Sequence, residues 1–142
     1  MSFREKSAWI ILITLVGLSI LFVLHVPPPY SMTPEPNAPA FHALMIMIGL
    51  FVGVIVIGHI VIAVLAPREA TSAKDERERL IALKATSIAA HLYAFLTIGG
   101  MFVALQLIGT NAIGIAYFIF SSFVVAEIVN YAMRVYYYRR GF

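Results

Sequence analysis

The stretch FHALMIMIGLFVGVIVIGHIVIAVLA occupies residues 41–66 and contains no charged side chain. A helix that crosses the roughly 30 Å hydrocarbon core of a bilayer needs about 20 mostly apolar residues. Backbone amide and carbonyl groups find no water in lipid, so they must be satisfied within the segment, as they are in an α-helix. The stretch therefore predicts a transmembrane helix that is long enough to tilt.

Three other stretches meet the same criterion, each with at most one charged side chain: residues 8–26, 80–108 and 112–133. The whole chain is 61% hydrophobic and 12% charged, whereas soluble domains are about 45–50% apolar and about 25% charged. We therefore predict an all-α fold, in which a single membrane domain over residues 1–142 forms a transmembrane four-helix bundle.

The ten basic residues share one side of this layout. They lie before the first predicted span, between the second and third as far as the membrane edge, or after the fourth. Because cytoplasmic loops carry the excess of Lys and Arg, this asymmetry predicts that both termini are cytoplasmic. The net charge of +3 then reflects topology and attraction to anionic lipid. Acidic residues alternate with the basic ones in the middle loop, which argues against a nucleic-acid partner.

Local motifs predict how the third and fourth helices begin and end. Asp75 is a candidate N-cap, and Glu78 is placed to complete a capping box. The segment Tyr136-Tyr137-Tyr138-Arg139-Arg140 is typical of an anchor at the lipid headgroups, and Trp9 is expected at the same level.

The acidic–basic run that opens the third helix consists of Asp75, Glu76, Arg77, Glu78 and Arg79. It predicts a solvated helix start, with docking of a cytoplasmic partner as the functional alternative.

Small residues mark expected contacts between helices. Gly49 and Gly53 form a small-xxx-small pair, and Gly99, Gly100 and Gly114 recur in the later spans. Such residues let helix backbones approach closely in a bilayer. We expect close packing at these positions, with a dimer as the alternative.

Two segments resemble a known family. FREKSAWI at residues 3–10 and DERERLI at residues 75–81 are similar to short bacterial integral membrane proteins of unknown function. Members of that family have four helices and this acidic–basic motif before the third span. The resemblance implies a bacterial cytoplasmic membrane and brings no activity, cofactor or catalytic residue with it.

Ionisable residues inside the spans are the candidates for function, because burying them in lipid is costly. Counted from the cytoplasmic ends of their spans at about 1.5 Å per residue, His59, His91 and Glu127 all lie roughly 10–12 Å deep. Asn130 lies one turn from Glu127. We therefore predict a polar intramembrane cluster formed by His59, His91, Glu127 and Asn130.

Three interpretations of this cluster stay open. The first is a buried hydrogen-bond network that fixes helix packing. The second is a haem b or metal site, with His59 and His91 as ligands and His25 and His42 as a second pair near the opposite face; a non-haem site would add Glu127. The third is a proton or solute relay through Glu127.

The chain has no cysteine, which excludes disulfides, thiolate metal sites and cysteine nucleophiles. It also lacks a phosphate-binding loop, a G-x-S-x-G elbow and an H-E-x-x-H motif. The sequence thus favours a non-enzymatic accessory or structural membrane protein with no cofactor. Its expected partners are the lipid bilayer and either a second copy or another member of a membrane complex. A haem- or metal-binding redox protein is the alternative.

Overall fold

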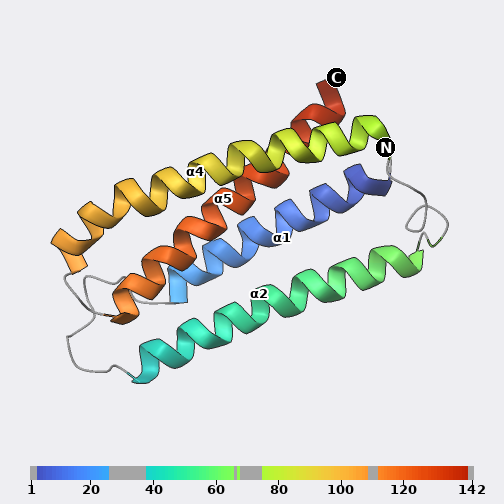
Figure 1. Ribbon diagram of the computed structural model, residues 1–142. Coiled ribbons are helices and arrows are strands. Elements are labelled where there is room, and N and C mark those ends of the chain that lie inside the picture. The colour runs from blue at the N-terminus through green and yellow to red at the C-terminus, as the bar shows by residue number, and fades with distance from the viewer. Residues whose placement is uncertain (1–2, 26–37, 66, 68–74, 109–111, 141–142) are drawn as a thin grey trace.

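The computed structural model describes residues 3–25, 38–65, 67, 75–108 and 112–140. These residues form α-helices and contain no strand. The helices are α1 (Phe3–His25), α2 (Ala38–Leu65), α4 (Glu76–Ile108) and α5 (Ala112–Arg140) (Figure 1). Each of them is long and apolar enough to cross a membrane. The predicted all-α class and the four predicted helices are therefore confirmed.

Two helices extend beyond the apolar stretches that predict them. α1 begins at Phe3 instead of residue 8, and α5 continues to Arg140 instead of ending at residue 133. The additional turns carry charged and tyrosine side chains. A helix needs apolar side chains only where lipid tails surround it, so it can continue through the headgroup layer with polar ones.

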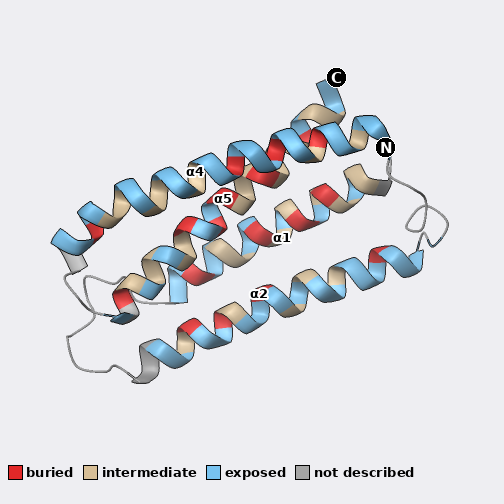
Figure 2. Ribbon diagram, viewed as in Figure 1, coloured by how far each residue is buried: buried red, intermediate tan, exposed pale blue. Residues whose placement is uncertain are grey.

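The helices pack in the order α2–α1–α5–α4, which Figure 1 shows from the bottom of the view to the top. α1 and α5 form a central pair, α2 packs mainly on α1, and α4 packs on α5. Burial follows this order: 22% of the apolar window is buried in α1 and α5, and 11% in α2 and α4. The outer faces of α2 and α4 are accordingly exposed (Figure 2).

Aromatic rings hold α1, α2 and α5 together. The ring centroid of Phe120 on α5 lies 5.4 Å from that of Phe22 on α1 and 5.6 Å from that of Phe51 on α2, and both pairs meet edge to face. Aromatic pairs prefer this geometry. Phe22 packs with Leu44 in one buried cluster and Phe51 with Val124 in a second, and Phe120 contacts both clusters.

Small side chains bring α4 and α5 together. Ile81 and Ala85 are fully buried and Ala89 is 4% exposed, one helical turn apart on the face that meets α5. Further along, a Cβ atom on Gly100 would lie 2.6 Å from Cζ of Phe118. Gly100 therefore gives the Phe118 ring room to pack against the α4 backbone.

The glycine pair of α2 behaves differently. A Cβ atom added at Gly49 or Gly53 would meet nothing within 4 Å. The prediction of close packing was thus wrong for these two positions within the described chain. For Gly100 the same prediction was correct. The reason is the helix order, which leaves one side of α2 without a neighbour.

The basic residues of the described chain gather at one end of the molecule, called the basic end below. Both termini lie there, together with the start of α4 (Figure 1). The residues are Arg4, Lys6, Arg77, Arg79, Lys84, Arg134, Arg139 and Arg140.

The substitution Gly100→Ala should destabilise the α4–α5 contact, because the new methyl group overlaps the Phe118 ring. Overpacking of this kind costs about 1–3 kcal/mol. We expect a lower melting temperature by circular dichroism in detergent. Gly53→Ala is the matched control: it meets open space and should leave stability unchanged or slightly raised. Equal losses in the two variants would contradict the close approach at Gly100.

Candidate functional site

A partly open chamber of about 300 Å³ lies between the four helices at the basic end. Polar side chains from every helix line it: Arg4 and Ser7 from α1, His59 from α2, Glu78 from α4, and Tyr131, Arg134 and Tyr138 from α5. Such a concentration of polar groups beside apolar helices identifies the chamber as the candidate functional site.

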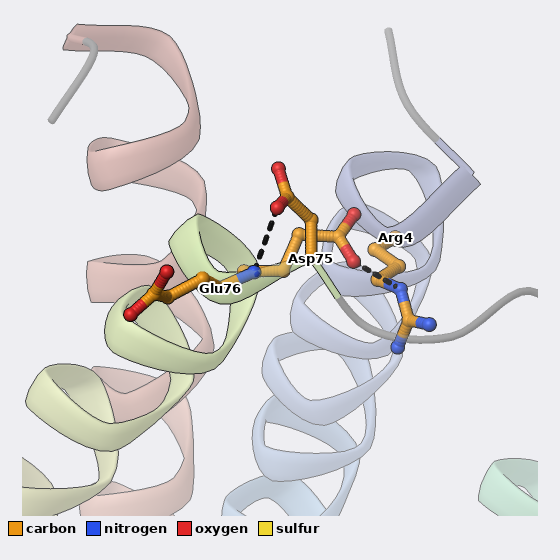
Figure 3. Close-up of polar contacts among 4 residues, drawn as sticks. Arg4, Asp75 and Glu76 are labelled. Carbon is orange, nitrogen blue, oxygen red and sulfur yellow. Dashed lines mark hydrogen bonds and ion pairs between the residues drawn. The ribbon is translucent and has the colours of Figure 1, made fainter.

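An ion pair between α1 and α4 closes one wall of the chamber. Nε of Arg4 lies 2.6 Å from Oε2 of Glu78, and each side chain is only about one-fifth exposed, at 22% and 20% (Figure 3). A charge-assisted hydrogen bond of this length is among the stronger polar contacts in proteins. It ties the first turn of α4 to the first turn of α1.

This ion pair replaces part of the predicted capping box. Asp75 does start α4, since its carbonyl oxygen accepts the Arg79 amide at 3.0 Å. Its carboxylate, however, accepts the adjacent Glu76 amide at 2.7 Å (Figure 3), and Glu78 reaches Arg4 instead of turning back to Asp75. The box was the wrong prediction, because a cation on the neighbouring helix attracts the carboxylate more strongly than a backbone amide does.

A second polar network connects α5 to α4. The Asn130 amide donates to Oε2 of Glu127 at 3.3 Å, and Nε of Arg134 donates to Oδ1 of the same Asn130 at 3.2 Å. A further guanidinium nitrogen of Arg134 donates to Thr86 Oγ1 at 3.3 Å. Asn130 thus bridges a carboxylate and a guanidinium, and Arg134 joins the two helices. These contacts do not test a relay through Glu127, which stays a prediction.

The two intramembrane histidines each bond to their own helix. Nδ1 of His59 lies 2.8 Å from the Ile55 carbonyl oxygen, and Nδ1 of His91 lies 2.6 Å from that of Ser87. Because a carbonyl oxygen only accepts, Nδ1 must carry the proton in both rings. In the neutral form Nε2 then holds a free lone pair. Both side chains are exposed on the protein surface.

Contacts between the helices indicate the heights of His91 and His59 relative to Glu127. Arg134 meets Thr86, and the Tyr93 ring meets the Phe123 ring at 6.2 Å, so His91 lies within a turn of the height of Glu127. α2 runs in the same direction as α5 (Figure 1) and its Phe51 ring meets the Phe120 ring of α5, so His59 also lies within about a turn of the height of Glu127. His59 lines the chamber together with Arg134 and Tyr138. The structure thus brings His59 to Arg134, and no hydrogen bond within the described residues joins either histidine to Glu127.

The other predicted pair lies at the opposite end. His25 donates through Nδ1 to the Leu21 carbonyl oxygen at 3.0 Å, and the His42 ring lies 6.2 Å from the Phe41 ring. Among the described residues, no three His, Asp or Glu side chains approach closely enough to hold a metal ion. The haem and metal predictions themselves stay predictions.

The aromatic tail packs on its neighbours at the basic end. The Arg139 guanidinium lies 5.2 Å from the centroid of Trp9 and 3.8 Å from Oε1 of Glu5. Arg140 lies 5.3 Å from the ring of Tyr136 and donates to its hydroxyl at 2.7 Å. Trp9 and the tail therefore share one level, as predicted.

Sequence reasoning missed the chamber. Arg4 entered the sequence analysis only as one of the cations that set the topology, and Tyr138 only as part of the expected interfacial anchor. One signal was present: Tyr131, Arg134 and Tyr138 follow the three–four spacing of a single helix face. Comparisons with protein-family models, with curated proteins and with solved structures found no match.

Exchanging the charges of Arg4 and Glu78 tests the α1–α4 contact. Arg4→Glu and Glu78→Arg should each lower the melting temperature, because each places like charges side by side. The double variant should recover part of the loss, with a coupling of about 0.5–1 kcal/mol. Arg79→Glu is the control, since Arg79 is exposed on the same helix turn and forms no ion pair with the described residues. Additive losses in the double variant would contradict the contact.

Proposed function

We propose that this chain is a multi-pass protein of a bacterial cytoplasmic membrane, with both termini in the cytoplasm. The gathering of the described cations at one end supports this orientation, because cytoplasmic segments carry the excess of Lys and Arg. The tail that stacks Arg139 on Trp9 and Arg140 on Tyr136 supports a headgroup layer at the same end. The location in bacteria is the expectation that comes from the family resemblance.

The absence of cysteine from the chain makes this topology easy to test. In intact cells, a thiol reagent that does not cross membranes should label Ser31→Cys, between the first two spans. It should label Ser72→Cys, between the second and third, only after the membrane is permeabilised. The reverse pattern would overturn the orientation, and equal labelling of both would overturn the second span, which alone separates the two positions.

Within that membrane, the role supported best is that of a non-enzymatic accessory or structural protein. One observation carries it: polar side chains near the cytoplasmic edge of the spans engage one another across the α4–α5 boundary, through the Arg134–Thr86 hydrogen bond. Polar contacts of this kind hold helices together at about 0.6 kcal/mol each on average. The exposed outer faces of α2 and α4 suit contact with a partner, either a second copy or another membrane protein.

The alternative is a redox protein that binds haem b or a metal through His59 and His91. One observation favours it: both rings donate through Nδ1 to a backbone carbonyl oxygen, which leaves Nε2 as the ligating atom. Against it, α2 and α4 flank the central pair on opposite sides (Figure 1). One haem held by both rings would require these two helices to be neighbours.

A visible spectrum of the purified protein, with a metal analysis, separates the two roles. The accessory role predicts a colourless, metal-free sample with full helix content. A Soret band that disappears in both His59→Ala and His91→Ala would instead establish the redox role through this pair. A band that is lost only in His25→Ala or His42→Ala would assign the haem to the second pair of histidines.

A further inference from the structure

We propose that the chamber at the basic end binds a phosphate group, carried either by an anionic lipid headgroup or by a free phosphate in the adjoining water. The proposal requires the chamber at the headgroup level of a membrane. It does not depend on the accessory role, because a redox protein could hold the same anion.

The charge balance of the chamber favours an anion. Two guanidinium groups and one carboxylate line it, and the carboxylate of Glu78 is paired with Arg4. Arg134 has no such partner: its hydrogen bonds within the described chain go to the neutral oxygens of Asn130 and Thr86. Glu127 reaches Arg134 only through the Asn130 amide and does not line the chamber. The lining therefore carries an unbalanced positive charge.

Contacts within the protein hold the Arg134 guanidinium in place before any ligand binds. The Arg134 guanidinium donates in two directions and lies 5.0 Å from the centroid of the Tyr131 ring. Fixing a guanidinium in this way lowers the entropy lost when it binds an anion. The planar fork of arginine also matches the oxygens of a phosphate group, which a lysine ammonium cannot do.

Further polar groups surround the same space. Ser7, Tyr131 and Tyr138 bring hydroxyls to the lining, and His59 brings a ring nitrogen that is not used within its helix. A phosphate oxygen accepts from hydroxyls. The OH of a free monohydrogen phosphate also donates to Nε2, whereas a phosphodiester headgroup has no such OH. The chamber volume of about 300 Å³ lies at the lower end of the range for small-ligand pockets, about 300–1,000 Å³.

The position of the chamber favours a lipid as the source of the phosphate. It lies beside the first turn of α1 and the last turns of α5, where the aromatic–arginine tail is expected to meet the headgroups. Basic pockets between membrane helices at this level are suited to anionic headgroups.

The experiment uses the full chain, purified and delipidated in a neutral detergent, with melting followed by circular dichroism. Three probes are titrated: phosphatidylglycerol, inorganic phosphate, and oleate, which is an anionic amphiphile without phosphate. A ligand that binds only the folded protein raises the melting temperature as it saturates the site. We expect a saturable rise with phosphatidylglycerol, with inorganic phosphate, or with both, and none of comparable affinity with oleate.

Arg134→Gln should weaken the binding of the effective probe by about tenfold or more, since it removes a charged donor. Arg140→Gln is the matched control. It removes the same charge from the same helix but lies outside the chamber, so it should bind as the unchanged protein does. Should Arg134→Gln lose helix content, Tyr138→Phe combined with His59→Gln gives the second test, with weaker binding expected and the α4–α5 contact kept.

The outcomes distinguish the two sources of phosphate and identify the results that would overturn the proposal. A response to phosphatidylglycerol alone supports the lipid source, and a response to inorganic phosphate supports a soluble one. An oleate response that Arg134→Gln abolishes would overturn the choice of phosphate. Equal weakening in Arg134→Gln and Arg140→Gln, or no response to any probe, would overturn the site.

Discussion

The exposure of large apolar side chains on every helix requires an apolar medium around this protein. Leu65 is 79% exposed, Phe95 is 73% exposed and Val64 is 72% exposed. A soluble monomer rarely presents contiguous apolar patches above a few hundred Å². Lipid removes that difficulty and also removes the hydrophobic attraction between helices, since acyl chains solvate leucine as well as another helix does. Packing and polar contacts must then hold the helices together.

The two main interfaces solve this problem in different ways. Between α1, α2 and α5, the Phe120 ring fills the junction by edge-to-face contacts. Between α4 and α5, Ala85 and Ala89 are buried at one part of the contact, and Gly100 leaves room for the Phe118 ring at another. Close packing of complementary surfaces therefore holds these helices together, as the hydrophobic effect does in a soluble core. The glycines of α2 make no such contact, because no other helix lies against them.

The sequence alone was sufficient to predict the features that depend on a single segment of the chain. Hydropathy located all four helices, and Asp75 marked the start of α4. Contacts between segments were harder, because Gly53 and Gly100 look alike in the sequence and differ only in what lies opposite. Glu78 has a satisfactory local role in a capping box, and only the approach of α1 shows that Arg4 is its partner. Depth counted along separate helices likewise could not show that His59 and Arg134 line the same chamber.

Arg134 links the packing of the helices to the chemistry of the chamber. The same guanidinium that joins α5 to Thr86 on α4 also faces the chamber beside Tyr131. An anion that binds the Arg134 guanidinium must change the strength of its hydrogen bonds to Asn130 and Thr86. Occupancy of the chamber and the α4–α5 contact are therefore thermodynamically coupled, and coupling between two such events is reciprocal. A polar network that stabilises membrane helices is thereby also able to respond to the membrane surface beside it.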